Sequence, residues 1–173
     1  MKSIVLSMKP RKIYNIGKYK ANNFIGCTPP KELPVKVYIY CQEIKDNKGY
    51  TDEIDVPFNT CQWCGNGKVV GEFICNEVVK QDYCGTEAYF WKVENLKIYD
   101  EPNELKNYKK VCKHWYDGER CEENCEYIKN MKEYIGYAPR SEYYDDDMPC
   151  EALGGMKPID IPRKWVYIDF IEE

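Results

Sequence analysis

Residues 35–41, VKVYIYC, are the clearest strand signal in the chain, and the prediction of the fold starts from them. Three β-branched residues and two tyrosines fill five of the seven positions, and both types are enriched in strands. Two consecutive prolines, Pro29 and Pro30, interrupt the chain just before this run. We therefore predict a strand at 35–41.

On the N-terminal side, residues 4–8 (IVLSM) predict another strand, and residues 9–17 (KPRKIYNIG) a short helix closed by Gly17. On the C-terminal side, residues 68–79 (KVVGEFICNEVV) predict one long strand, in which Gly71 indicates a bulge or a close backbone approach. The other predicted elements are strands at 88–93, 96–99 and 164–171 and a short helix at 103–110.

This order of elements shows no strand–helix alternation, which favours an α+β protein over a parallel sheet. We predict a small mixed β-barrel with two or three short helices. The chain has 173 residues, 43% of them hydrophobic, which suits one globular domain with a small appendage. Residues 1–110 and 158–173 are expected to form the barrel, and residues 111–157 a cysteine-rich arm inserted before the last strand.

Charge is unevenly distributed along the chain. Residues 1–36 carry eight basic side chains and one acid, a net charge of +7, which leaves −11 for residues 37–173 because the whole chain is −4. A basic segment on an acidic body steers a polyanion to one face. The alternative is a solvated lysine surface without a ligand.

The order and spacing of these segments resemble those of ASCH-domain proteins, and more closely the cysteine-bearing ASCH proteins of phages and prophages of Gram-positive bacteria. The resemblance covers residues 1–42, 66–110 and 158–173 and rests on IVLSM, the KP helix ending in glycine, LPVKVYIYC, GKVVGEF, WKVENLKIYDEPNEL and a final P-x-x-W-x-Y strand. It implies a PUA-like β-barrel with a cleft for RNA or modified nucleosides. A few members of the family are hydrolases or ribonucleases.

The chain departs from the family at a motif of the form Gly-x-Lys-x-x-Glu-x-Arg. Counted from Gly17, the family's lysine, glutamate and arginine are replaced by Tyr19, Asn22 and Phe24. Without the carboxylate, general-base chemistry at this place loses its proton acceptor. We therefore assign no catalytic residue and favour a protein that is not an enzyme. Glu72 is the nearby carboxylate that would have to replace the base, and an ordinary solvent-facing or salt-bridged glutamate is the alternative.

The basic N-terminal segment supplies the predicted binding residues. Cations hold phosphates and aromatic rings stack on bases in single-stranded nucleic-acid sites. With the cleft that the resemblance implies, the residues expected near its mouth are Lys9, Arg11, Lys12, Lys18 and Lys20, with the rings of Tyr19 and Phe24 beside them.

The segment 111–125, VCKHWYDGERCEENC, holds three cysteines and the chain's one histidine. The start of the chain has too short an apolar run for a signal peptide, and no stretch reaches membrane-spanning length. We therefore expect a cytoplasmic protein whose ten cysteines are thiols or metal ligands. Zinc takes four thiolate or imidazole ligands, so a structural zinc would order the arm, with free thiols or a disulfide as alternatives. The resemblance favours the ligands Cys112, Cys121, Cys125 and Cys150, with His114 as rival for the fourth place.

A second pair, Cys61-x-x-Cys64, has no strand–helix redox context. With Cys75 or Cys84 it would make a second metal site, and this possibility stays open. Catalytic zinc is disfavoured because an open site uses histidines and a neighbouring carboxylate.

Three functions follow from the sequence. The first is a binding module for RNA or a nucleotide, and the second a hydrolase acting on RNA or a modified nucleoside. The third is a phage inhibitor of a host defence protein, favoured by the acidic cluster at 142–147 (EYYDDD), although most acidic runs are solvated loops. No membrane partner is expected, and the oligomeric state is open.

Overall fold

A computed structural model describes residues 1–43, 67–112 and 155–172 of the chain. They belong to two compact units. Unit 1 consists of Met1–Leu105 and Ile161–Tyr167, and unit 2 of Lys106–Asp160 and Ile168–Glu173. No helix in the described part is long and apolar enough to cross a membrane.

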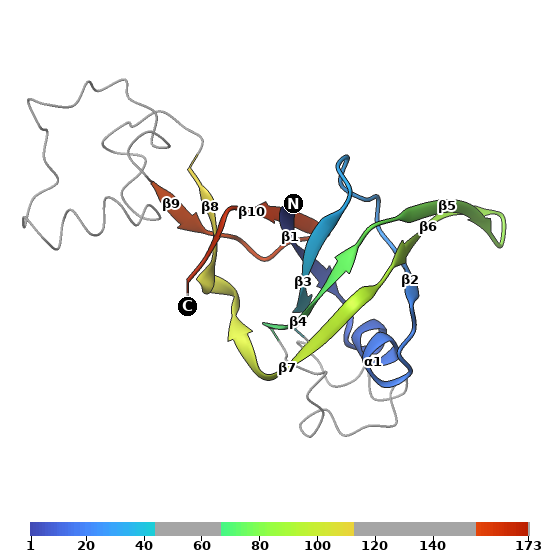
Figure 1. Cartoon of the computed structure of the whole chain (residues 1–173), viewed down its shortest axis with the longest axis horizontal. Coiled ribbons are helices and arrows are strands. Elements are labelled where there is room, and N and C mark those ends of the chain that lie inside the picture. Colours follow the sequence, from blue (N-terminus) through green and yellow to red (C-terminus); the bar gives the residue numbers. More distant parts are fainter. Residues whose placement is uncertain (44–66, 113–154, 173) are drawn as a thin grey trace, which may run out of the picture. The chain divides into compact units, whose positions relative to one another are not determined.

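Unit 1 is built on a five-stranded sheet with the order β10-β1-β3-β4-β7 (Figure 1). The two strands β1 and β3 run parallel, whereas β4 is antiparallel to both of its neighbours. The bounds are Lys2–Met8 for β1, Val35–Cys41 for β3, Lys68–Cys75 for β4, Glu94–Glu104 for β7 and Trp165–Ile168 for β10.

A second, antiparallel sheet and one helix complete unit 1. The sheet has the order β2-β6-β5, with bounds Asn23–Gly26 for β2, Val78–Tyr83 for β5 and Thr86–Lys92 for β6. The helix α1, Pro10–Lys18, follows β1 and buries Ile13 and Ile16. Both sheets and the helix contribute to one hydrophobic core, in which Trp91 is fully buried.

The alternation along β3 explains which face of the larger sheet meets that core. Val35, Val37 and Ile39 belong to the core cluster, while Lys36 and Tyr38 alternate with them and point to the opposite face. The predicted close approach at Gly71 is confirmed. A Cβ atom there would lie 2.5 Å from the Lys97 carbonyl oxygen on β7, and the β4–β7 register shifts beside it.

Unit 2 contains a small antiparallel sheet of order β11-β8-β9. Its strands are β8 (Tyr108–Val111), β9 (Met156–Pro158) and β11 (Phe170–Ile171). The Lys109 side chain is buried and its ammonium lies 2.7 Å from Glu172 Oε2. A buried lysine needs such a partner because an unpaired charge away from water is costly.

The predicted fold class, an α+β protein built on a small mixed β-barrel with two or three short helices, is wrong. The described residues form open sheets and a single α-helix, and the two edge strands of the large sheet, β10 and β7, do not pair with each other. No helix spans residues 103–110. Instead β7 runs to Glu104, a 3₁₀ turn η1 covers Leu105–Asn107, and β8 follows. Pro102 lies in β7, an edge strand, where a missing N–H is tolerated.

Other local predictions had mixed outcomes. The strands at 4–8, 35–41 and 88–93 and the helix at 9–17 are confirmed within a few residues. The single strand predicted at 68–79 is wrong, because β4 ends at Cys75 and β5 begins at Val78 in the other sheet. The division into a barrel and an inserted arm stays a prediction, since most of residues 111–157 lie outside the described part.

Candidate functional site

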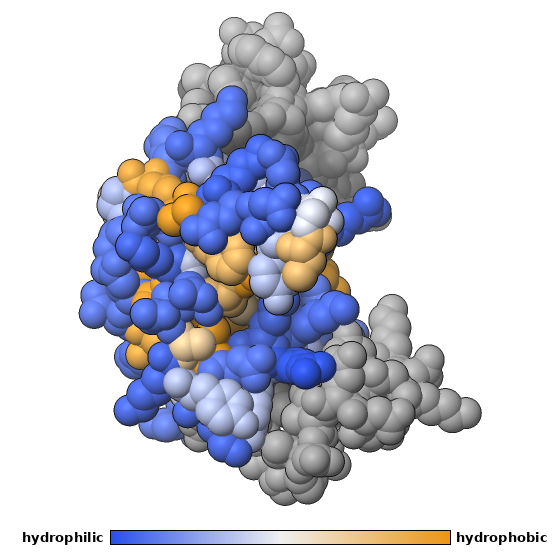
Figure 2. All heavy atoms as spheres, turned by 90° about the vertical axis from the view of Figure 1, so that its right-hand side faces the viewer, coloured by the Kyte–Doolittle hydropathy of each residue, from blue (hydrophilic) through white to orange (hydrophobic). Residues whose placement is uncertain are grey.

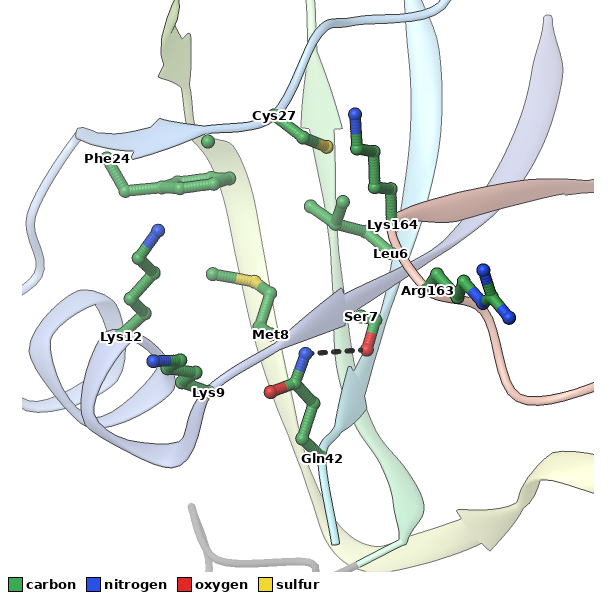
Figure 3. Close-up of a pocket in the computed structure, with 11 residues that line it drawn as sticks. Leu6, Ser7, Met8, Lys9, Lys12, Phe24, Cys27, Gln42, Arg163 and Lys164 are labelled. Atoms are coloured by element: carbon green, nitrogen blue, oxygen red, sulfur yellow. Dashed lines mark hydrogen bonds between the residues drawn. The ribbon is translucent and has the colours of Figure 1, made fainter. Parts of the chain in front are cut away.

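A pocket of about 250 Å³ opens in unit 1. Its lining comes from β1, α1, β2, the residue after β3 and the segment before β10 (Figure 3). The lining residues are Leu6, Ser7, Met8, Lys9, Lys12, Phe24, Gly26, Cys27, Gln42, Arg163 and Lys164.

The apolar floor of the pocket is part of the hydrophobic core. Leu6 and Met8 reach it from the core face of β1. Phe24 stacks on Trp91 with ring centroids 6.0 Å apart and meets Phe73 edge to face at the same distance. These two contacts hold the Phe24 ring against the core.

Gly26 permits this ring packing. A Cβ atom at position 26 would lie 2.7 Å from the Trp91 ring and 2.9 Å from the Phe24 ring. The Trp91 indole N–H donates to the Cys27 carbonyl oxygen at 2.8 Å, which fixes β2 against the tryptophan. The glycine therefore holds the pocket wall close to the core.

Two lysines enter the pocket from the start of α1. Lys9 is the residue that precedes the helix, and Lys12 lies in its first turn. The Lys12 ammonium donates to the Ile25 carbonyl oxygen at 2.5 Å. Partial burial lowers the pKa of Lys12; Cys27 acts in the opposite direction, and the neighbouring Lys9 adds to the lowering. The helix N-terminus adds a partial positive charge at the same place.

Two further cations, Arg163 and Lys164, come from the segment that leads into β10. The Lys164 carbonyl oxygen accepts a hydrogen bond from the Ser7 N–H of β1 at 2.7 Å. The next residue, Trp165, donates its indole N–H to the Thr28 carbonyl oxygen at 2.8 Å. These bonds fix the backbone, while both cationic side chains remain exposed.

The pocket has a polar edge and one thiol. Gln42 Nε2 donates to Ser7 Oγ at 3.1 Å, and the Gln42 N–H donates to the Met8 carbonyl oxygen at 3.0 Å. Burial raises the pKa of the Cys27 thiol, although the charges of Lys164 and Lys12 act against it. Cys27 is therefore a neutral thiol near pH 7 rather than a thiolate nucleophile.

The lining holds four cations and no aspartate, glutamate or histidine. Within the described residues none of these four cations forms an ion pair. The face of the molecule in Figure 2 is mostly hydrophilic, with hydrophobic surface limited to small areas. The four cations of the lining suit an anionic ligand, because charge-assisted hydrogen bonds to phosphate or carboxylate are stronger than hydrogen bonds between neutral groups.

Only part of the predicted binding set lines this pocket. Lys9, Lys12 and Phe24 lie around it. Lys18 donates instead to the Tyr14 hydroxyl, and its ammonium lies 5.7 Å from the centre of the Tyr19 ring. At 3.6 residues per turn, Tyr14 points about 160° away from Lys12. Arg11 and Lys20 are exposed and are not among the lining residues.

Sequence reasoning missed Arg163, Lys164 and Gln42. The signal for the first two was an adjacent basic pair within P-x-x-W-x-Y, directly before a strand. Nothing local connects that pair to the N-terminal lysines, because the connection is the pairing of β10 with β1.

Glu72 lies elsewhere, on the face of the sheet opposite the core. Its carboxylate accepts a hydrogen bond from the Tyr99 hydroxyl at 2.7 Å and lies 3.2 Å from the Lys36 ammonium. Burial alone would raise the pKa of Glu72, but Tyr99 and Lys36 outweigh it and the pKa is lowered. A general base near neutral pH needs the opposite shift.

The predicted zinc site falls mostly outside the described residues. Cys112 is buried at the end of β8, and its N–H donates to the Gly155 carbonyl oxygen at 2.9 Å. Residues 113–154, with the other three proposed ligands and His114, are not described, and neither are Cys61 and Cys64. Among the described residues no three candidate ligands come together. Zinc therefore stays a prediction.

Cys75 and Cys84 differ in their burial. Burial raises the pKa of Cys75 to about 11, so this thiol is neutral in the core. Cys84 is exposed, between β5 and β6.

No protein-family model matches the chain, and no curated protein does. Among solved structures, the chain is similar to a tyrosine-to-phenylalanine mutant of ZmASCH from Zymomonas mobilis. The match has 14% sequence identity and a TM-score of 0.40 and covers 82% of this chain and 88% of that one. It names the family that the sequence resembles, but at these values it does not show family membership. The ligand has to be inferred from the pocket itself.

Proposed function

We propose that the protein binds single-stranded RNA or a nucleotide through the pocket of unit 1. The observation that carries the proposal is a set of four cations without an acid among the lining residues. Phosphate is an anion that such a set suits, because lysine and arginine form strong charge-assisted hydrogen bonds with phosphate oxygens.

The apolar floor supports a nucleotide over a bare phosphate ion. Ligand pockets combine mostly apolar walls with a few polar groups that orient the ligand. Here Leu6, Met8 and Phe24 supply the apolar floor, and the Gln42 amide is a polar group beside it. A base placed on this floor brings its phosphate to the cations at the rim.

Hydrolysis is less well supported. The lining residues contain no carboxylate or imidazole, and Glu72 is held by Lys36 and Tyr99 away from the pocket. Inhibition of a host protein depended on the acidic cluster at 142–147, which lies outside the described residues. No observation of the described part favours either alternative.

The test is a fluorescence-anisotropy titration of a labelled single-stranded RNA at low salt. Lys12→Gln with Lys164→Gln removes one cation from each end of the lining, and we expect binding at least about tenfold weaker, since each charge-assisted contact is a strong one. The matched control is Lys80→Gln with Lys92→Gln, two lysines paired with Glu87 and Glu77 outside the pocket. Absence of binding by the parent at low salt, or equal loss in the control, would contradict the proposal.

A further inference from the structure

The four pocket cations form two groups on two sides of the floor. Figure 3 shows Lys9 and Lys12 on the helix side and Arg163 and Lys164 on the other, with the β1 side chains Leu6 and Met8 between them. We call the first group the helix pair and the second the strand pair.

One lysine of each pair, Lys12 and Lys164, lies near the same side chain, Cys27. Burial raises the pKa of Cys27 overall. The charges of Lys164, from the strand pair, and Lys12, from the helix pair, both act against this rise. The Cys27 side chain therefore lies within electrostatic reach of one lysine from each pair. A ligand that fills the pocket beside Cys27 is exposed to positive charge from two directions.

A single anion does not satisfy this arrangement. A phosphate held by one pair leaves the other pair without an acidic partner among the described residues. A ligand with one anionic group at each end and an apolar or planar middle neutralises both. Within a nucleic-acid strand, each internal nucleotide has this form, because a phosphate flanks its sugar on both sides.

We propose that the pocket holds one internal nucleotide of a single strand, with its 5′ phosphate against one pair, its 3′ phosphate against the other, and the base over the apolar floor. This inference rests on the proposed function and narrows it to strand interiors rather than free mononucleotides or strand ends.

The experiment is a competition titration against a labelled single-stranded RNA. The competitors are adenosine 3′,5′-bisphosphate, adenosine 5′-monophosphate, adenosine 3′-monophosphate and inorganic pyrophosphate. We expect the bisphosphate to bind about tenfold or more tightly than either monophosphate, because the second phosphate gains a charge-assisted contact. Pyrophosphate, which has no base or sugar between its phosphates, should compete no better than the monophosphates.

Two double variants then assign the phosphates. Lys9→Gln with Lys12→Gln should weaken one monophosphate and spare the other, and Arg163→Gln with Lys164→Gln should do the reverse. In both variants the bisphosphate should fall to about the affinity of a monophosphate. Lys80→Gln with Lys92→Gln, which leaves the pocket intact, should keep the full advantage of the bisphosphate.

The outcomes separate this inference from the proposed function. If RNA binds and both pocket variants weaken it, but the bisphosphate binds no more tightly than the monophosphates, the two-phosphate arrangement is wrong and the proposed function stands. Equal competition by pyrophosphate and bisphosphate would also overturn it, because the pocket would then recognise charge alone. If no RNA binds at low salt, both fail.

Discussion

Unit 1 uses lysine in two different ways. On the face of the sheet opposite the core, Lys36 lies 3.2 Å from a Glu72 carboxylate oxygen, and Tyr99 donates to the same carboxylate. In the pocket, Lys12 and Lys164 face no acid among the lining residues. The strand register makes the difference, because Glu72 of β4 stands opposite Tyr38 and beside Lys36 of β3. Lys36 is therefore paired within the sheet, whereas Lys12 and Lys164 have no carboxylate among the residues that line the pocket.

The pKa of Lys36, on the face of the sheet opposite the core, and the pKa of Lys12, in the pocket, shift in opposite directions. Burial alone would lower the pKa of Lys36, but Tyr38 and Glu72 outweigh it and the pKa is raised. Burial lowers the pKa of Lys12, and no carboxylate compensates. The pairing of Lys36 with Glu72 therefore adds to stability at neutral pH, whereas Lys12 receives no such contribution from a carboxylate.

The largest effect should come from Gly71, where β4 lies close to β7 beside Glu72. We expect Gly71→Ala to destabilise the protein by about 3 kcal/mol, the upper end for overpacking, because the added methyl group meets backbone atoms that cannot move away cheaply. Urea denaturation measures this loss. Gly85→Asn is the control, since Gly85 has open space and a φ of +78° that asparagine tolerates. A Gly71→Ala variant as stable as the parent would contradict the close approach.

Glu72→Gln should remove the ion pair with Lys36 and leave the lining of the pocket unchanged. We expect a loss of about 2 kcal/mol at pH 7, typical of hydrogen bonds to a charged group. Because the pKa of Glu72 is lowered, its contribution is present above the ordinary glutamate pKa of about 4.3 and is lost as the pH falls through the lowered value. The difference between parent and variant should therefore shrink in acid. Denaturation at pH 7 and below pH 4 checks this, and a pH-independent difference would exclude the carboxylate as its cause.

Lys12→Met should weaken RNA binding and leave stability almost unchanged. Lys12 is exposed and its ammonium donates one hydrogen bond, to the Ile25 carbonyl oxygen, so we expect stability to fall by no more than about 1 kcal/mol, the net contribution of one such bond. RNA binding should weaken about tenfold, as for loss of one strong contact. Paired denaturation and anisotropy measurements decide the point. A large loss of stability with unchanged binding would make Lys12 a structural residue like Lys36.

The smallest effect should come from Lys18, the last residue of α1. Its ammonium is bound to the Tyr14 hydroxyl and is not part of the pocket. We expect Lys18→Gln to change RNA affinity by less than about twofold, the size of a distant screened charge. An effect as large as that of Lys12→Gln in the same titration would extend the binding surface around the helix.

Local patterns predicted the elements that depend on local chemistry. β1, α1 and β3 follow from an apolar run, a proline at the first helical position and a β-branched alternation. The prediction failed at Pro102, where the sequence indicates the start of a helix. Pro102 lies in β7, and β7 is a strand because it pairs with β4 at the edge of the large sheet. The lining of the pocket could likewise be predicted only where it depends on local sequence. Lys9 and Lys12 were predicted from the helix that carries them, but Arg163 and Lys164 join them only because β10 pairs with β1.

Phosphate binding in the pocket is tested most directly by the dependence of RNA affinity on salt for the parent and for Lys12→Gln with Lys164→Gln. Each phosphate contact contributes about 0.7 to the slope of log affinity against log salt for a single strand. We predict a slope shallower by about 1.4 in the double variant and an unchanged slope in Glu72→Gln. Parallel lines for parent and double variant would show that the pocket cations make no phosphate contacts, and would contradict the account.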